Sequence, residues 1–479
     1  MKNYLLLAFV IGFFVACKET PNPLDTEEQD VVLPIAALED SSLENAVIYE
    51  ANIRQYSPEG TFDAFTKDIP KLKDLGVKII WLMPVHPISM VKRKAENDSS
   101  VEDIDDPEER KKYLGSYYSI ADYGAVNPDH GNMEDFAELV NTAHDNDMYV
   151  IMDWVPNHTG WDHPWITEHP EYYTKNQAGE ITDPLNDQGE PWGWTDVADL
   201  NYQNVEMQEA MISEMKFWIT ERDVDGFRCD VAHSVPVEFW QKAIPELRKE
   251  KDIFMLAEAE LPELMTNDLF EMSYAWEVHH ILNAIAKGEQ DVTAFDAYMK
   301  RYAERWEEND ILMNFITNHD ENSWAGPVKE RMGEASEALL ALTYCMPGMP
   351  LVYSGQEYDL DRRLKFFEKD TIPKEKGATW PLLEKLGHIK NTHPALHGGK
   401  EAASYDRITT SNDDKVLAFR RRGGNSEVIF VANLSDEPIS FTMELDGSFE
   451  FLFNKSNLGF KRDFQHEYAP WEYEILIRN

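Results

Sequence analysis

Residues 224–232 read "VDGFRCDVA", a short apolar run that contains an arginine and an aspartate. Side chains two positions apart in a β-strand point to the same face, so Arg228 and Asp230 are expected to project together. Cys229 should face the opposite side as a small buried hydrophobe. A cation beside a carboxylate favours the charged form, which suits a nucleophilic aspartate. From this stretch alone, a structural ion pair at a strand end is an equally good interpretation.

Similar runs recur along the chain, most of them separated by amphipathic segments such as 62–76 and 133–147. The eight expected strands are 46–53, 77–85, 148–155, 224–232, 252–260, 273–279, 311–317 and 349–355. Near-continuous apolar strands that alternate with helices are typical of a parallel sheet. Eight of them favour an α/β fold of the (β/α)8 TIM-barrel type over an open doubly wound sheet. No glycine-rich nucleotide-binding motif follows any of these strands.

Two segments depart from this alternation. Residues 158–205 have no helical period and contain Trp161, Trp165, Trp192 and Trp194. A loop of this length inside a compact domain is usually functional or forms a small inserted domain. Residues 399–479 instead show alternating strands with turn residues between them, which predicts a C-terminal antiparallel β-sandwich. The barrel is then expected over residues 43–398.

The first 42 residues are expected to export and tether the protein. Residues 1–17 combine a lysine, an apolar run too short to span a membrane as a helix, and a small residue before Cys17. The stretch "FVAC" resembles a bacterial lipobox, which implies that a lipid on Cys17 anchors an exported protein to a membrane of the cell envelope. Residues 18–42 are acidic and contain prolines, as expected of a tether.

The composition narrows the class of partner. The chain has 88 acidic and 45 basic residues, a net charge of −43, which repels nucleic acid and anionic substrates and suits a neutral ligand. The three cysteines show neither disulfide pairing nor metal-ligand spacing.

Charged and polar side chains gather where the expected strands end, which is where TIM barrels carry their chemistry. Buried charge is costly unless it is used or paired, so acids at several strand ends indicate a catalytic site rather than packing. The residues in question are Asp153, Asn157 and His158 after the third strand, Arg228 and Asp230 on the fourth, Glu258 on the fifth, and His319 and Asp320 after the seventh.

The motifs "DWVPNH", "GFRCDVAH" and "NFITNHD", with the strand that bears Glu258, resemble the four signature regions of the α-amylase family of retaining glycoside hydrolases. "DVADLN" (196–201), "GMPLVYSGQE" (348–357) and "SYYSIADYGAVNPDHG" (116–131) resemble further motifs of that family. The resemblance covers roughly residues 46–479. It implies that the insertion at 158–205 is the domain B of that family.

The resemblance also implies roles for individual residues. Asp230 would be the nucleophile, Glu258 the general acid/base and Asp320 the stabiliser of the transition state. Arg228 would hold Asp230 ionised. The substrate-binding residues would be Tyr118, stacked beneath a sugar, with Asp153, His158, Arg228 and His319.

The chemistry requires the two reacting carboxyls to differ in protonation. In retaining glycosidases they lie about 5–5.5 Å apart, a distance that neighbouring barrel strands can provide. We expect Asp230 to be ionised beside Arg228 and Glu258 to hold a proton until the leaving oxygen takes it.

No cofactor is required for this chemistry, but the family commonly binds a structural calcium. The resemblance implies that Asn157 and Asp199 help to hold it, and oxygen ligands suit that ion. The family's usual histidine four residues after the nucleophile is Ser234 here, with His233 one place earlier.

The sequence therefore predicts an exported α-amylase-like enzyme that cleaves α-1,4-glucosidic bonds of starch-like glucans and maltooligosaccharides. Alternatives within the family are a cyclomaltodextrinase or neopullulanase, an α-glucosidase and a glucanotransferase. A glucan-binding surface lipoprotein without activity is disfavoured because Asp230, Glu258 and Asp320 are all present.

Overall fold

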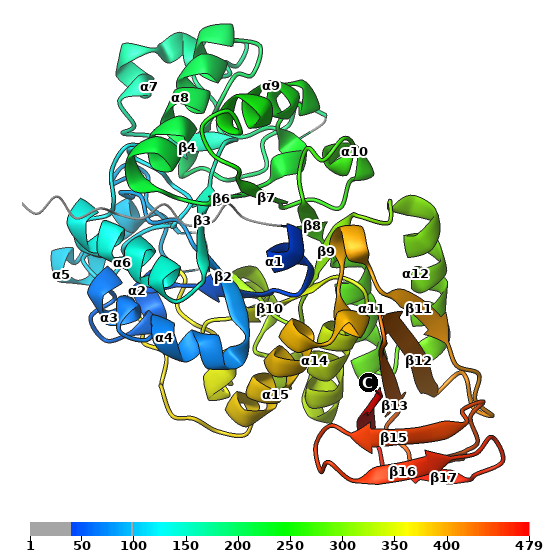
Figure 1. The fold of residues 1–479 in the computed structure, drawn as a ribbon. Helices are drawn as coiled ribbons and strands as arrows, with labels where there is room; N and C mark the ends of the chain where they lie inside the picture. The colour runs from blue at the N-terminus through cyan, green and yellow to red at the C-terminus, as the bar shows by residue number, and fades with distance from the viewer. Residues whose placement is uncertain (1–39, 97–98, 187, 479) are drawn as a thin grey trace, which may run out of the picture. The chain divides into compact units, whose positions relative to one another are not determined.

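The eight expected strands form a closed parallel barrel in the computed structural model, which describes residues 40–96, 99–186 and 188–478 (Figure 1). Their order around the barrel is β1-β10-β9-β8-β7-β6-β3-β2. The strands are β1 (Val47–Ala51), β2 (Val77–Leu82), β3 (Tyr149–Trp154), β6 (Gly226–Cys229), β7 (Phe254–Ala257), β8 (Met272–Tyr274), β9 (Ile311–Asn314) and β10 (Met349–Tyr353). The predicted TIM barrel is confirmed.

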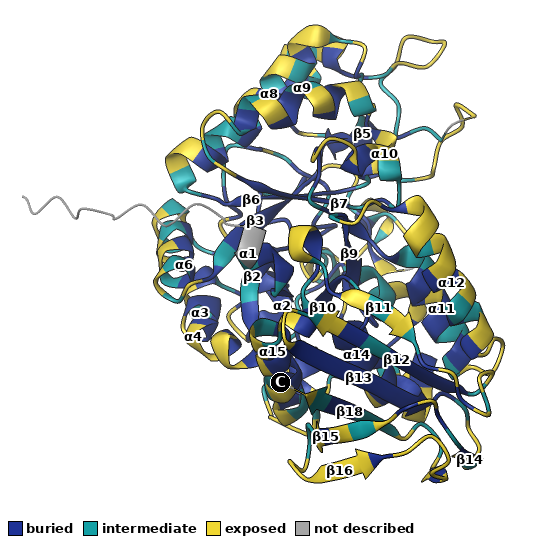
Figure 2. Cartoon of the chain, turned by 45° about the vertical axis from the view of Figure 1, so that its right-hand side comes forward, coloured by how far each residue is buried: buried dark blue, intermediate teal, exposed yellow. Residues whose placement is uncertain are grey.

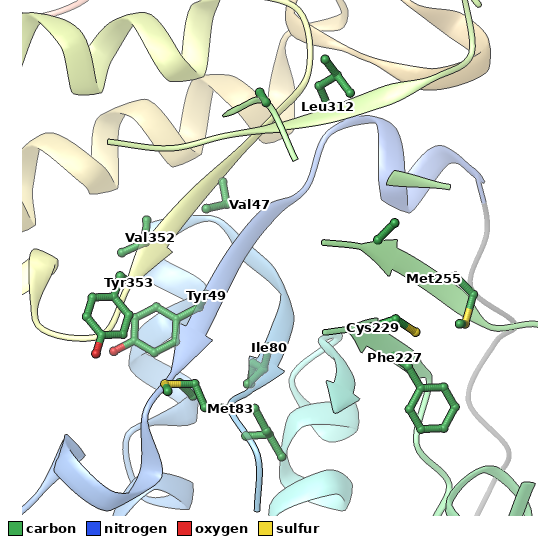
Figure 3. Close-up of a cluster of buried hydrophobic side chains, with 14 of the residues drawn as sticks. Val47, Tyr49, Ile80, Met83, Phe227, Cys229, Met255, Leu312, Val352 and Tyr353 are labelled. Atoms are coloured by element: carbon green, nitrogen blue, oxygen red, sulfur yellow. The ribbon is translucent and has the colours of Figure 1, made fainter. Parts of the chain in front are cut away.

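Alternation along the strands divides the apolar side chains into two layers. One layer fills the barrel interior and includes Ile48, Trp81, Ile151, Leu256, Tyr274 and Met313. The other lies between strands and helices, and Figure 3 shows part of it, including Phe227, Cys229 and Met255. Cys229 is fully buried in this outer layer, as predicted, so its neighbour Arg228 points into the barrel.

Helices surround the strands and turn their polar faces outward (Figure 2). The longer helices are α6 (Met133–Asp145), α8 (Val205–Arg222), α9 (Val237–Leu247), α11 (Trp276–Ala286), α12 (Val292–Arg305), α14 (Ser336–Cys345) and α15 (Thr379–Thr392). The shorter ones are α1 (Asp40–Glu44), α2 (Ile53–Tyr56), α3 (Phe62–Thr66), α4 (Ile69–Leu72), α5 (Pro107–Arg110), α7 (Trp165–Glu168), α10 (Pro262–Met265) and α13 (Val328–Met332).

The two amphipathic segments behave differently. The segment at 133–147 forms the single helix α6, which starts with a capping box in which Asn132 and Asp135 each bond the other's backbone N–H. The segment at 62–76 is divided into α3, α4 and a 3-10 turn at Lys73–Leu75. Pro70 lies in the first turn of α4, where it lacks the N–H that would continue the helix from α3.

The insertion after β3 is closed by a small antiparallel ribbon. Strand β4 (His158–Gly160) pairs with β5 (Val197–Asp199), so the ends of the 158–205 segment lie side by side. Between them lie α7 and a 3-10 turn at Pro170–Tyr172. The Trp161 ring nitrogen donates to the Thr195 carbonyl oxygen at 3.0 Å, a further link across the insertion.

The C-terminal part forms the predicted antiparallel sheet, with three strands more than the sequence indicated. Its six-stranded sheet has the order β11-β12-β13-β18-β15-β16, and β14 pairs separately with β17. The bounds are β11 (Ser404–Arg407), β12 (Val416–Gly423), β13 (Ser426–Asn433), β14 (Ile439–Phe441), β15 (Gly447–Phe451), β16 (Asn457–Phe460), β17 (His466–Tyr468) and β18 (Tyr473–Arg478). The sequence indicates five strands, at 415–422, 427–435, 438–445, 449–454 and 471–479, so the unpredicted ones are β11, β16 and β17, which are three or four residues long.

Strand β13 is buried at every position, because the large sheet is covered on both faces. Ile429 and Val431 share a cluster with Phe441 of the small sheet, whereas Val428 and Phe430 belong to the core that includes the barrel helices. Arg421 of β12 is also buried and donates to the carbonyl oxygen of Cys345, at the end of α14.

Within the described residues, no helix has the length and apolar character needed to cross a membrane. The predicted signal segment 1–17 with Cys17, and nearly all of the predicted tether 18–42, lie outside the described residues. From residue 40 onward the described chain belongs to one compact unit, so the domain boundaries at 43, 158, 205 and 399 stay predictions.

Candidate active site

Arg228 lies inside the barrel and pairs with three carboxylates. Its Nη1 lies 2.8 Å from Asp153 Oδ1 and 2.9 Å from Asp230 Oδ1, and its Nη2 lies 2.9 Å from Glu258 Oε2. The guanidinium is fully buried, and its Nε donates to the Tyr274 hydroxyl at 3.2 Å. One cation therefore fixes carboxylates that come from three stretches of the chain.

The strand register explains this convergence. Asp153 of β3 is the partner of Arg228 on β6, and Arg228 is the partner of Leu256 on β7, two residues before Glu258. Parallel strands end at the same edge of a barrel, so their last side chains meet there. Gly226 makes the close approach of β6 and β7 possible, because a Cβ at this position would lie 1.8 Å from the Phe254 carbonyl oxygen.

Asp230 and Glu258 differ in the direction of their pKa shifts. Burial and the charge of Glu258 raise the pKa of Asp230 well above its usual value, although Arg228 opposes the shift. Burial also raises the pKa of Glu258, but the charge of Arg228 and the Val231 N–H outweigh it, so the net shift is downward. Arg228 therefore acts on both carboxyls, whereas the sequence-based expectation assigned it to Asp230 alone.

The backbone at Val231 contributes to this arrangement. Its N–H donates to Glu258 Oε2 at 2.7 Å. Its backbone angles, φ 37° and ψ 46°, lie in the left-handed region, which a β-branched residue rarely adopts. Strain of this kind persists where the surrounding structure enforces it, and it is concentrated at functional sites. Here it directs an N–H toward the candidate acid.

A second charged group joins β1 to the loop after β9. His319 Nδ1 lies 2.6 Å from Glu50 Oε1, and its Nε2 lies 3.3 Å from Asp320 Oδ2 and 2.7 Å from the Tyr118 hydroxyl. Burial alone would lower the pKa of His319, but the charges of Asp320 and Glu50 raise it to about 9. His319 is therefore a cation at neutral pH, held between two carboxylates.

The raised pKa of His319 predicts a loss of stability in alkali. A histidine whose folded-state pKa exceeds its unfolded value stabilises fully below the unfolded pKa, about 6.5, and this contribution is lost as the pH rises through the folded value, here about 9. We expect the free energy of unfolding, measured in urea, to fall by about 3 kcal/mol across this range. In Glu50→Gln one carboxylate is lost, so the decline should be smaller and should be complete at lower pH.

A matched control is the exposed pair of His169 and Glu171, whose atoms lie 3.2 Å apart. Glu171→Gln should leave the pH dependence of unfolding unchanged, because solvent screens the pair. An unaltered pH profile in Glu50→Gln would contradict the role given to Glu50.

A cleft of about 510 Å³ opens above these groups. Its aromatic walls come from segments far apart in the chain. Trp192 stacks on Trp194 with ring centroids 5.7 Å apart, and Trp324 packs against Phe366 at 5.0 Å. Trp192 and Trp324 are 53% and 57% exposed, which is unusual for such large side chains in a monomer. The cleft thus offers flat apolar faces around a group of acids, a surface suited to sugar rings.

Most of the predicted site residues come together at this cleft. It is lined by Tyr118, His158, Asp230, Glu258, His319 and Asp320. Tyr118 stacks on His319, with ring centroids 5.5 Å apart. His158 is buried, and burial lowers its pKa to about 4, so it is a neutral hydrogen-bonding group at neutral pH.

Two assignments are corrected. Asp153 and Arg228 are fully buried and do not line the cleft, so they cannot contact a substrate there. Asp153 instead accepts hydrogen bonds from the Trp81 ring nitrogen at 3.1 Å and the Tyr118 hydroxyl at 3.2 Å. Both residues position the groups that do face the cleft. The substrate-binding role was implied by the family resemblance, which does not reveal how deeply a side chain is buried.

Sequence reasoning also missed functional candidates. Glu50 had a signal, an acid within the apolar run "AVIYEANI". Trp324, Phe366 and Phe367 carried none, because they lie outside the motifs and reach the cleft only through the loops after β9 and β10. Val231 could not be found from the sequence, because it contributes a backbone N–H, and that group does not depend on the type of residue.

The predicted calcium ligands Asn157 and Asp199 start from neighbouring positions of the backbone. The Leu200 N–H donates to the Asn157 carbonyl oxygen, and β4 pairs with β5 at Asp199, so the two side chains start close together. Burial raises the pKa of Asp199 to about 6. Calcium takes about 6–8 oxygen ligands, and within 40–96, 99–186 and 188–478 no group of three or more His, Cys, Asp or Glu could hold a metal ion.

Comparison with known proteins identifies the class that this barrel and its acidic cleft define. The family model described as "Alpha amylase, catalytic domain" matches residues 35–381. The chain therefore belongs to the alpha-amylase family, whose members here include hydrolases and transferases.

Individual relatives differ in their reactions. Alpha-amylase MalA of Haloarcula japonica is 26% identical over 407 residues, which are 82% of this chain and 56% of that protein. An alpha-1,4-glucan:maltose-1-phosphate maltosyltransferase of Cereibacter sphaeroides is 26% identical over 431 residues, 85% of this chain and 68% of that protein. The chain thus spans little more than half of the first of these relatives.

A solved structure gives a fuller match. The noncanonic maltogenic alpha-amylase AmyB from Thermotoga neapolitana has a TM-score of 0.78 and 28% sequence identity, over 91% of this chain and 98% of that one.

Proposed function

We propose that this protein is a retaining glycoside hydrolase that cleaves α-1,4-glucosidic bonds in starch-like glucans and maltooligosaccharides. The observation that carries the proposal is that one guanidinium holds both carboxyls, with Arg228 Nη1 2.9 Å from Asp230 Oδ1 and Nη2 2.9 Å from Glu258 Oε2. Two carboxyls held at the two ends of one guanidinium lie close together, as in retaining enzymes, where they are about 5–5.5 Å apart rather than the about 6.5–9.5 Å of inverting enzymes. Such carboxyls suit a mechanism in which one carboxylate attacks the sugar directly.

The reaction requires Glu258 to hold a proton and Asp230 to be ionised when a sugar is bound. Asp230 then attacks the anomeric carbon while Glu258 protonates the glycosidic oxygen, which leaves with the electron pair of the broken bond. Glu258, now ionised, takes a proton from water, and the resulting hydroxide displaces Asp230 from the same carbon.

The other residues at the cleft hold the sugar and stabilise charge. Asp320 lies beside the reacting centre, where a carboxylate stabilises the oxocarbenium-like transition state. His319 and His158 are placed to bond sugar hydroxyls, the first as a cation and the second as a neutral group. The neutral substrate also suits a chain with a net charge of −43.

The test is a product profile on maltoheptaose, γ-cyclodextrin and pullulan, with the anomeric form of the first product read by NMR. Release of α-anomeric maltooligosaccharides from maltoheptaose is the expected result. β-Anomeric first products would overturn the retaining mechanism, and preferential opening of γ-cyclodextrin would favour a cyclomaltodextrinase.

A second candidate is transfer to another sugar rather than to water. The similarity to a maltosyltransferase and the aromatic walls of the cleft, which could hold an acceptor ring, favour it. Products longer than the maltoheptaose supplied would identify a glucanotransferase. Glucose as the sole product would identify an α-glucosidase, and binding without turnover would leave a glucan-capture protein.

Glu258→Gln separates acid catalysis from binding. The variant should lose turnover of maltoheptaose by at least about 10²-fold, the usual contribution of a general acid, while its Kd for maltooligosaccharides stays within a few-fold. With α-maltosyl fluoride, whose leaving group needs no proton, formation of the glycosyl-enzyme should persist. The neighbouring Glu260, which does not line the cleft, provides the control as Glu260→Gln. Equal losses on both substrates would assign the acid role elsewhere.

The chemistry needs no cofactor, since attack, protonation and charge stabilisation all come from side chains. Calcium, if it binds at Asn157 and Asp199, would be structural. Chelation with EDTA should therefore leave kcat unchanged. If EDTA lowers the Tm of the native protein, it should not lower the Tm of Asp199→Asn, which lacks one of the two proposed ligands.

We also propose that the protein is exported and anchored to a membrane of the cell envelope through Cys17. The support is the lipobox-like "FVAC" that ends the apolar run. Cys17→Ser should move the protein from the membrane to the soluble envelope fraction. Retention of the variant on membranes would defeat the lipid-anchor assignment.

A further inference from the structure

A second cavity, of about 370 Å³, lies apart from the catalytic cleft, on the side of the barrel where β9 and β10 end. Its walls come from the loop after β9, from α13, α14 and α15, and from the segment after β10. No residue of this cavity lines the catalytic cleft. Its size falls within the range of about 300–1,000 Å³ that small-molecule sites occupy.

Two buried polar groups line this cavity without hydrogen-bond partners among the described residues. They are the Thr317 hydroxyl and the Gln356 Nε2 amide, and their residues are 3% and 8% exposed. A buried polar group without a partner costs about 1–3 kcal/mol. A ligand that offers an acceptor to Gln356 and a hydroxyl to Thr317 would remove that cost.

The remaining walls describe the kind of ligand that fits. Ile316, Leu340 and Leu382 give an apolar surface, whereas Glu337, Asp359 and Asp361 place carboxylates around the opening. Lys329 also lines the cavity and donates to the Ser336 hydroxyl at 2.8 Å, so the three carboxylates leave the walls negative and disfavour an anion. Apolar faces combined with neutral polar groups are the counterpart of a sugar ring, which has C–H faces and a rim of hydroxyls.

We propose that this cavity binds a neutral sugar of one or two hexose units. The choice of a sugar over another neutral polyol rests on the proposed function, because hydrolysis of glucans would release such molecules beside the cavity. The cavity itself, its unpartnered groups and its charge are independent of that function.

The cavity is connected to the catalytic loop through the chain. Thr317 precedes His319 by two residues, and Asn322, which also lines the cavity, follows Asp320 by two. Asn322 is fixed to the segment after β10, because its Nδ2 donates to the Arg362 carbonyl oxygen at 3.0 Å and its Oδ1 accepts from the Leu364 N–H at 2.9 Å. A bound sugar would therefore touch both ends of the segment that carries His319 and Asp320.

The test is calorimetric titration of the full protein with maltose, supported by a crystal soak. We expect two molecules per chain for the native protein. Leu382→Trp, which fills the cavity from α15, should bind one and keep its initial rate on maltoheptaose. Gln356→Leu should weaken the cavity site about 5-fold, the effect of one lost hydrogen bond. Trp192→Ala is the matched variant in the cleft and should weaken only the other site.

Several outcomes would overturn the proposal. They are one maltose per native chain, an unchanged number in Leu382→Trp, or a soaked cavity that holds only water. Binding of glucose 6-phosphate or of spermidine there, without maltose, would also reject a neutral sugar. The proposed function fails separately, if turnover is absent while two maltose sites are found.

Discussion

Asp230→Asn should fold normally and lose turnover of maltoheptaose by at least about 10³-fold, since the amide cannot act as the nucleophile that forms the covalent intermediate. The change keeps the size of the side chain and its hydrogen bond with Arg228 Nη1, which lies 2.9 Å from Asp230 Oδ1. Burial raises the pKa of Asp230 and so favours a neutral side chain at this position, which is why the neutral amide should cost little stability. The measurements are kcat and Tm.

Asp310→Asn is the matched control. Asp310 is also a buried aspartate, but it immediately precedes β9, at the opposite end of the barrel from the cleft. This variant should keep kcat within a few-fold. Native-like turnover in Asp230→Asn would remove Asp230 from the role of nucleophile, and a collapsed Tm would show that its carboxyl is mainly structural.

Arg228→Ala should have the largest effect on stability. It leaves Asp153, Asp230 and Glu258 buried without their shared cation, and breaking a buried ion pair costs about 3–5 kcal/mol. Without Arg228 the pKa values of these carboxyls rise above their unfolded values. The stability that remains is then fully present below the unfolded pKa, near 4, and declines as the pH rises. The loss relative to the native protein should therefore be greater at pH 8 than at pH 5.

Arg421→Ala provides the comparison. Arg421 is buried to a similar extent, but the acceptors that surround it are carbonyl oxygens, among them those of Ser404, Cys345 and His397. Its removal takes no partner from a carboxylate, so the losses at pH 5 and pH 8 should differ only through Lys390, whose pKa burial and the charge of Arg421 lower to about 7. A pH-independent loss in Arg228→Ala would contradict the idea that Arg228 serves chiefly to neutralise the three acids.

The barrel could be predicted because each of its strands is a run of apolar residues, and that property is local. The same reasoning missed β11, β16 and β17, which are only three or four residues long, so that pairing with neighbours rather than composition makes them strands. The division of residues 62–76 had a local signal, Pro70, that the amphipathic pattern concealed.

At the site, sequence placed Arg228 and Asp230 on one face because that relation lies within one strand. The relation between Arg228 and Asp153 depends on how β3 and β6 align, which no single strand encodes. The pKa shifts of the two acids could not be predicted for the same reason. They depend on the contacts of Glu258 with Arg228 Nη2 and with the Val231 N–H, and these contacts exist only after the strands have assembled.

The double coverage of β13 affects how this protein can evolve. This strand packs against the barrel helices on one face and against the small sheet on the other. The C-terminal part therefore cannot be exchanged as an independent domain. A recombination junction near residue 400 would expose Val428 and Phe430 together with their partners on the barrel. Gene fusions that preserve a working enzyme should therefore inherit both parts together.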